Sequence, residues 1–176
     1  VENYVVDRNE VETSFYVRAK GDKIFALKKA EETGAPAAAI ELPDGRIVTG
    51  KTSALLGASS AALFNALKYL AGIDDSIRLI SPEVIEPIQK LKTGYMGNTN
   101  PRLHTDEALI ALSICGTADE NAERAFDALA GLRGSELHST VILSPIDLNV
   151  FRKLGVNVTC DPRTKVSSLK FKPDLA

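Results

Sequence analysis

The octapeptide from Gly45 to Thr52 has the residue types and spacing of a phosphate-binding loop. Its sequence, GRIVTGKT, satisfies the pattern G-x-x-x-x-G-K-[ST], in which main-chain amides surround phosphate groups and the lysine reaches them. Such a loop must coil, whereas residues 46–50 alternate and are rich in β-branched types, which favours a strand. The preceding Pro43-Asp44-Gly45 is typical of a hairpin turn. We therefore expect an extended hairpin strand here and not a nucleotide loop.

A strand at this place would bring Lys51 and Thr52 close to the start of the next helix. That helix is amphipathic, with Ser59 or Ser60 as the predicted N-cap and Gly72 at its end. Free amides at a helix start, the helix dipole and a lysine together favour the binding of an anion. The alternative is that the lysine is simply solvated and the hydroxyl groups only cap the helix.

Two further helix starts supply candidate binding groups. Ser81-Pro82-Glu83 combines a cap, a proline at the first helical position and an acid at the positive end of the dipole. His104 and Asp106 begin another helix after the loop 93–104, which is long enough to suggest a function. The complete set of candidate ligand-binding residues is Lys51, Thr52, Ser59, Ser60, Ser81, Glu83, His104 and Asp106.

Metal chemistry is an alternative use of some of these residues. Glu83 and Glu86 are spaced to share one helix face, and with His104 they offer ligands for a hard metal ion. Acids in the first turns of a helix are also common for dipole reasons alone. Cys115 and Cys160 stand in no paired motif, and we expect buried, inert thiols. The leading interpretation therefore includes no metal and no cofactor.

The composition indicates one globular core. The chain has 176 residues, of which 44% are hydrophobic and 25% charged, and a length of this kind buries roughly 70% of the unfolded surface. A formal charge of -2 provides no electrostatic footprint for nucleic acid or an anionic membrane. The longest apolar run, residues 108–112, is far shorter than the ~20 residues that span a bilayer. Cysteine usage and the lack of a signal-peptide pattern favour a cytoplasmic location.

Helical and strand patterns alternate along the chain. This alternation predicts an α/β fold, a three-layer αβα sandwich around a mixed sheet. Residues 1–21 fit either a strand pair or a helix, and the basic tail from Asp161 is expected to be a surface strap. We divide the chain into an N-terminal segment, 1–35, and an α/β domain, 36–176, with a helical insert at about 93–133. The predicted strands are 36–42, 46–50, 76–80, 140–143 and 156–160, and the predicted helices are 22–34, 59–72, 82–91, 105–114, 117–131 and 144–154.

From Asp22 to Cys160 this order of elements resembles the cytidine-deaminase-like fold. The resemblance implies zinc ligands and a catalytic glutamate at the starts of the second and third helices. The present chain has Ala58-Ser59-Ser60-Ala61 at the first place and Pro82-Glu83-Val84-Ile85-Glu86 at the second. The proline matches, but the cysteines and the proton shuttle do not. The resemblance therefore implies a zinc-free relative whose two helix starts meet in space.

From Ala39 onward, the amino-acid sequence itself resembles one bacterial family. Residues 39–160 resemble the C-terminal part of the family called domain of unknown function 1846, also uncharacterised protein family 0371, in the segments AIELPDGRIVTGKTSALLGASSAALFNALKYLAGIDD, LISPEVIEPIQKLKTGYMGNTNPRLHTDEALIALSI and LRGSELHSTVILSPIDLNVFRKLGVNVTC. Members are longer, which implies that an N-terminal portion precedes this part and is its partner. Some carry an ATP-dependent protease label, for which this chain has no H-E-x-x-H motif. The family has no catalytic residues to transfer.

Three hypotheses follow. The leading one is a zinc-free, deaminase-like domain that binds a small anionic ligand or a nucleotide near the candidate residues named above. The second is a non-catalytic module whose apolar helix faces drive self-association, so that the protein is a homo-oligomer. The third is a metal-dependent enzyme that uses Glu83, Glu86 and His104.

Overall fold

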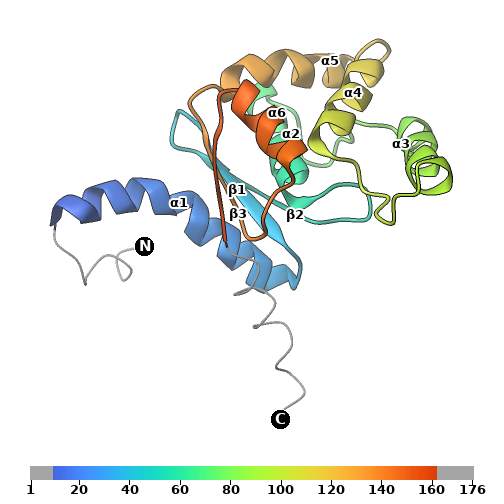
Figure 1. Cartoon of the computed structure of the whole chain (residues 1–176). Coiled ribbons are helices and arrows are strands. Elements are labelled where there is room, and N and C mark those ends of the chain that lie inside the picture. Colours follow the sequence, from blue (N-terminus) through green and yellow to red (C-terminus); the bar gives the residue numbers. More distant parts are fainter. Residues whose placement is uncertain (1–9, 162–176) are drawn as a thin grey trace, which may run out of the picture.

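The computed structural model describes the main chain from residue 10 to residue 161 and the side chains from residue 21 to residue 161 (Figure 1). The expectation of a basic surface strap after Asp161 therefore lies outside the described residues. The same holds for residues 1–9, the first part of the segment for which a strand pair and a helix both stayed open. The remainder of that segment, from Glu10, belongs to a helix.

Four strands form one mixed sheet in the order β2-β1-β3-β4. Strand β1 is antiparallel to both of its neighbours, with Ala39 opposite Thr49 on one side and opposite His138 on the other. Strands β3 and β4 are parallel. This confirms the α/β class with a mixed sheet. The strands are β1 (Ala37–Glu41), β2 (Ile47–Lys51), β3 (Glu136–Ser139) and β4 (Asn157–Cys160).

Six α-helices surround this sheet within the described part of the chain. A π-helical stretch, η2 (Leu91–Tyr95), continues α3, and a 3₁₀ turn, η3 (Ala128–Leu132), continues α5. The α-helices are α1 (Glu10–Thr33), α2 (Ala58–Ala71), α3 (Pro82–Lys90), α4 (Thr105–Cys115), α5 (Glu120–Asp127) and α6 (Pro145–Lys153).

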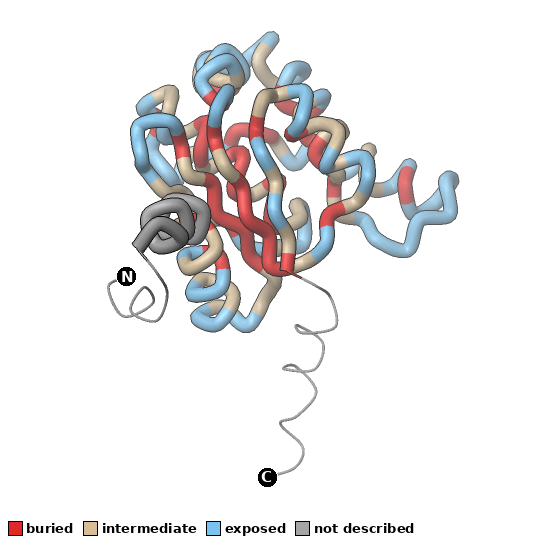
Figure 2. The backbone as a smooth tube through the Cα atoms, turned by 60° about the vertical axis from the view of Figure 1, so that its left-hand side comes forward, coloured by how far each residue is buried: buried red, intermediate tan, exposed pale blue. Residues whose placement is uncertain are grey.

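Helices cover both faces of the sheet, and Figure 2 shows the buried strands running through the middle of the molecule. Successive side chains of a strand point to opposite faces. Ala38 and Ile40 of β1 therefore face the main core, which includes Leu63 and Leu67 of α2. Ala39 shares the other face with its neighbour His138, where Lys23 of α1 reaches Asp161 and Asp161 lies 3.2 Å from His138.

The octapeptide from Gly45 to Thr52 lies in the predicted hairpin. Gly45 has a positive φ of 85° in the turn, and Leu42 N donates to Arg46 O to close it. The chain then runs extended through β2, as the β-branched alternation predicts. The strand interpretation is confirmed, and no phosphate loop forms at these residues.

Two of the five predicted strands are wrong in place or in kind. Residues 76–80 form turns and bends, because Asp74 accepts hydrogen bonds from the main-chain amide and the hydroxyl of Ser76. Leu79 and Ile80 are buried without pairing in the sheet. The strand predicted at 140–143 lies four residues earlier, at the more polar residues 136–139 of β3.

Several helix starts also differ from the prediction. Helix α2 begins at Ala58 with Gly57 as its N-cap, so Ser59 and Ser60 lie inside the first turn. His104, and not Thr105, is the N-cap of α4. Asp119 caps α5, because its carboxylate accepts from Ala122 N, which replaces the expected cap at residue 117. The predicted cap of α6 at residue 144 and the left-handed end of α2 at residue 72 are confirmed.

Some apolar side chains of the helices lie outside the core. Leu91 and Phe126 are exposed. On α4, Ile110 and Ile114 are exposed as well. Cys115 and Cys160 are free and only partly buried, not fully buried as expected.

Candidate functional site

The N-terminal ends of α2, α4 and α6 meet at one cavity of about 260 Å³. We call it the helix-start cavity. Each helix N-terminus carries unpaired amides and the positive end of a helix dipole, so their meeting creates a place that favours negative charge. The residues that line it are Pro36, Thr52, Gly57–Ser60, Asn100, Arg102–His104, Val141–Ser144 and Asp147.

The start of α2 is the part of the cavity with free donors. No side chain caps this helix, and its first intrahelical bond runs from Ala61 N to Gly57 O. The amides of residues 58–60 therefore have no acceptor within the helix. Ser59 is only 4% exposed, and its hydroxyl forms no hydrogen bond with any residue from 21 to 161. The Ser59 hydroxyl is therefore a free donor at the wall of the cavity, open to a ligand or to water.

A buried hydrogen bond joins the start of α2 to the start of α4. Ser60 Oγ lies 3.0 Å from Thr105 Oγ1, and both residues are fully enclosed. Because Ser60 is occupied in this way, it contributes structure to the cavity wall, whereas the neighbouring Ser59 hydroxyl is left for a ligand.

Asp147 joins the starts of α4 and α6. Its Oδ1 accepts from Thr105 N at 2.8 Å, and its Oδ2 accepts from Ser144 Oγ at 2.8 Å. His104 Nδ1 lies 3.7 Å from the same Oδ2. Burial acts to raise the pKa of Asp147, but the hydrogen bonds from Thr105 and Ser144 and the nearby His104 outweigh it, and the pKa is lowered. Asp147 is therefore a carboxylate whose two oxygens are already engaged.

Arg102 supplies positive charge to the same cavity. Its Nε donates to Ser53 O at 2.5 Å, which anchors the guanidinium. Its terminal amino groups make no hydrogen bond within the part of the chain that the structure describes, so these donors are available. Asp147 is the single acidic residue of the lining and its two oxygens face Thr105 and Ser144, so the free donors of the cavity are those of Arg102 and of the start of α2.

The structure brings together half of the residues predicted from the sequence. Thr52, Ser59, Ser60 and His104 line the helix-start cavity. The other four, namely Lys51, Ser81, Glu83 and Asp106, are not part of its lining.

Simple geometry explains where the other four residues lie. Lys51 is paired with Ala37 at the end of β2 and, by the alternation of a strand, points to the α1 face, while Thr52 points to the α2 face. Ser81 and Glu83 begin α3, whose start was expected to meet that of α2. Residues at both of these helix starts line a separate pocket of about 300 Å³, but Ser81 and Glu83 are not part of its lining either. Asp106 instead accepts from Glu107 N within α4.

Sequence reasoning missed Arg102, Ser144 and Asp147 as members of the site. Arg102 lies in the long loop 93–104 that was singled out for its length, and Ser144 was recognised only as a helix cap. No local signal pairs Asp147 with residues 42 positions earlier, at the start of α4.

The metal hypothesis has no assembled ligand set. Within residues 21–161, no group of three or more His, Cys, Asp or Glu side chains is placed to hold a metal ion. Glu83 and Glu86 lie on α3, whereas His104 lines the helix-start cavity at the N-cap of α4.

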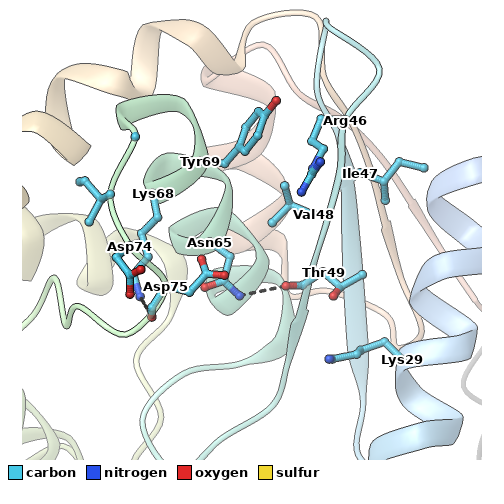
Figure 3. Close-up of a pocket in the computed structure, with 12 residues that line it drawn as sticks. Lys29, Arg46, Ile47, Val48, Thr49, Asn65, Lys68, Tyr69, Asp74 and Asp75 are labelled. Atoms are coloured by element: carbon cyan, nitrogen blue, oxygen red, sulfur yellow. Dashed lines mark hydrogen bonds between the residues drawn. The ribbon is translucent and has the colours of Figure 1, made fainter.

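A larger hollow of about 820 Å³ lies beside the outer edge of β2 and the end of α2 (Figure 3). Several of its polar groups contact one another or the main chain. Arg46 lies over the ring of Tyr69 at 5.1 Å, and Asn65 Nδ2 donates to Thr49 O at 2.9 Å. Lys68 Nζ donates to Asp75 O at 2.8 Å. We favour the helix-start cavity as the functional site, because three helix N-termini and the Arg102 side chain meet there.

Comparison with known proteins identifies the chain's relatives. The model of the family described as "Domain of unknown function DUF1846, C-terminal" matches residues 22–169. A UPF0371 protein of Corynebacterium aurimucosum is 63% identical over 137 residues, which cover 78% of this chain and 28% of the relative. A UPF0371 protein of Streptococcus pneumoniae is 56% identical over 139 residues, 79% of this chain and 28% of the relative. The chain thus spans less than a third of the length of these relatives.

None of the helices between residues 10 and 161 combines the length and the apolar character that crossing a membrane requires.

Proposed function

We propose that this chain, which belongs to the DUF1846 family as its C-terminal domain, binds a small anionic ligand in the helix-start cavity. The recognised part of the ligand is a phosphate or carboxylate group. One observation carries the proposal. The uncapped start of α2 presents free amides and the hydroxyl of Ser59 to the same cavity that Arg102 lines.

The groups around the cavity match the oxygen atoms of a phosphate. The amides of residues 58–60 and the Ser59 hydroxyl are donors on one wall, and the guanidinium of Arg102 is a charged, forked donor on another. A charge at a helix N-terminus gains about 0.3–1 kcal/mol from the dipole of each helix at an exposed site, and more where water is excluded. Leu103 and Leu143 provide an apolar wall for a short carbon skeleton.

The size of the cavity limits the ligand. Sites for drug-sized molecules and cofactors generally occupy about 300–1,000 Å³. With about 260 Å³, the helix-start cavity suits a single phosphate or carboxylate on a small carbon skeleton. Of the two ligand classes expected from the sequence, a small phosphorylated compound is therefore favoured over a whole nucleotide.

The finer architecture that we propose is deaminase-like without zinc. The order of helix, hairpin, helix and later parallel strands supports this relationship, as does the mixed sheet with β1 antiparallel to both neighbours. In that reading, the start of α2 keeps its place at the binding site. Its partners are the starts of α4 and α6, so binding relies on amides, hydroxyls and an arginine.

Isothermal titration of the 176-residue chain with inorganic phosphate tests this function. We expect saturable binding that falls about tenfold in Arg102→Ala and several-fold in Ser59→Ala, because each variant removes a donor. Lys51→Ala is the matched control, since it removes one positive charge outside the cavity and should bind as the unaltered chain does. Equal losses in Lys51→Ala and Arg102→Ala, or no binding at millimolar phosphate, would contradict the proposal.

Self-association is a second candidate function, which the surface of η2 favours. Tyr95 is 78% exposed and Met96 is 62% exposed, and Leu91 adds to this apolar surface. Figure 1 shows α3, which η2 continues, on the side of the molecule away from α1. Exposed apolar patches commonly mark interfaces. Light scattering of the chain and of Tyr95→Ser across a concentration series tests it, and a strict monomer at high concentration contradicts it.

A further inference from the structure

Lys92 is a buried lysine close to the helix-start cavity. Its residue is only 2% exposed, although lysine is among the residues that are least often buried. Its Nζ lies 2.6 Å from Glu107 Oε2 and donates to Arg102 O, also at 2.6 Å. The buried ammonium is therefore paired with a carboxylate and with a main-chain carbonyl.

Glu107 extends this contact to the other side of Leu103. The same Oε2 that receives Lys92 also accepts from His104 N at 2.8 Å. Leu103 N itself donates to Leu55 O at 3.0 Å. The main chain of residues 102–104 is consequently held at three successive positions, and two of these contacts depend on the Lys92–Glu107 pair.

Two of the residues held in this way line the cavity. Arg102 and His104 both line it, and each has its main chain in contact with the Lys92–Glu107 pair. An apolar side chain would fill the space around Lys92 without the cost of burying a charge. A lysine is required only if its hydrogen bonds to the loop matter.

The main chain around Lys92 is also irregular at this point. Met96 N donates to Leu91 O at 3.1 Å, which is the wider repeat of η2, and Asn98 N donates to Lys92 O at 2.9 Å. Such π-helical stretches are rare and frequently occur at functional sites. Here the widened turn of η2 precedes the loop that leads to Arg102. Lys92 connects the two, because its Nζ donates to Arg102 O.

We propose that Lys92 is a positioning residue of the anion site: through Arg102 O and Glu107 it fixes the segment 102–104 so that the Arg102 guanidinium faces the free amides of α2. This inference rests on the proposed function, because it concerns the same cavity. Anion affinity then depends on the Lys92 side chain, which does not line the cavity. Because Lys92 belongs to η2, this dependence couples η2 to the anion site.

The test compares Lys92→Met with Lys90→Met in the 176-residue chain. Lys90 is exposed two positions earlier, so its variant removes the same charge without touching the loop. We expect Lys92→Met to lower the affinity for inorganic phosphate about tenfold, and Lys90→Met to leave it unchanged. In the ligand-free protein, amide hydrogen exchange of His104 should speed up in Lys92→Met only, which is a readout independent of binding.

A double variant separates positioning from general loosening. If Lys92 acts through Arg102, then Lys92→Met with Arg102→Ala binds phosphate no more weakly than Arg102→Ala alone. Additive losses, or unchanged affinity in folded Lys92→Met, would overturn the inference while leaving the proposed function in place. Failure of the unaltered chain to bind phosphate removes both.

A second variant covers the case in which Lys92→Met does not fold. Glu107→Gln keeps the shape and the acceptor oxygen but removes the charge that pairs with Lys92. We expect it to fold and to lose affinity several-fold. A folded Glu107→Gln chain with full affinity and unchanged exchange of the His104 amide would also overturn the inference.

Discussion

A Cβ atom added to Gly50 would lie 2.1 Å from the main-chain nitrogen of Ala62. The first turn of α2 therefore packs directly on the main chain of β2, at a distance that only glycine permits. Gly50 is the second glycine of the sequence pattern that resembles a phosphate loop. Its role in this fold is close helix-to-strand packing, which sets where the start of α2 and the helix-start cavity lie.

Gly50→Ala should destabilise the chain by about 3 kcal/mol or more, because the methyl group meets main-chain atoms that cannot rotate away. Urea unfolding followed by circular dichroism measures the change. Gly94→Ala is the control, since nothing lies within 4 Å of the added Cβ there, and it should change stability by less than about 1 kcal/mol. A Gly50→Ala chain as stable as Gly94→Ala would contradict the close packing.

Asp22 predicts a pH-dependent loss of stability. It is only 2% exposed, and burial raises its pKa to about 6 against the hydrogen bond from Lys23 N, with the charges of Glu41 and Glu136 adding to the rise. A raised folded-state pKa means that the folded protein holds this proton more tightly than the unfolded chain. The resulting stability is fully present below pH 3.8, the unfolded pKa, and is lost as the pH rises through about 6.

Asp22→Asn should remove this dependence. The amide oxygen of the asparagine still accepts from Lys23 N, but no negative charge forms at this buried position of α1. We expect the variant to match the unaltered chain near pH 3.5 and to be more stable by up to about 3 kcal/mol above pH 6.5, from a shift of about two pKa units. Unfolding free energies across this range measure the difference, with the exposed Asp75→Asn as the charge control. A constant difference between pH 3.5 and 7 would refute it.

The bond between Ser60 and Thr105 should contribute to stability as a pair. Thr105→Val keeps the shape of the side chain and the main-chain bond to Asp147, but leaves Ser60 Oγ buried without its partner. The expected loss is about 1–3 kcal/mol. Ser60→Ala with Thr105→Val should cost less than the sum of the single variants, because both polar groups are then gone. Strict additivity in a double-mutant cycle would show that the two hydroxyls are not coupled.

Local chemistry allowed the hairpin and several helix ends to be predicted from the sequence alone. The Asp-Gly turn before β2, the left-handed Gly72 after α2 and the Ser144 cap of α6 all depend on residues within a few positions of one another. The strands were harder, because pairing is decided by distant partners. Residues 76–80 are apolar enough for a strand but remain unpaired. Strand β3 instead contains the buried His138, whose Nδ1 lies 2.7 Å from Thr159 Oγ1 and whose Nε2 lies 3.2 Å from Asp161 Oδ2.

The sequence by itself determined the α/β class, the extended course of the Gly45–Thr52 octapeptide and the presence of a helix after it. These follow from periodicity and steric preference, which act along the chain. Only the tertiary structure decided what faces that helix start. Arg102 and Asp147 line the same cavity from positions far along the chain. A change of one position separates Lys51, on the α1 face, from Thr52, in the cavity. Side chains meet in a site through packing in three dimensions, and no local pattern encodes that meeting.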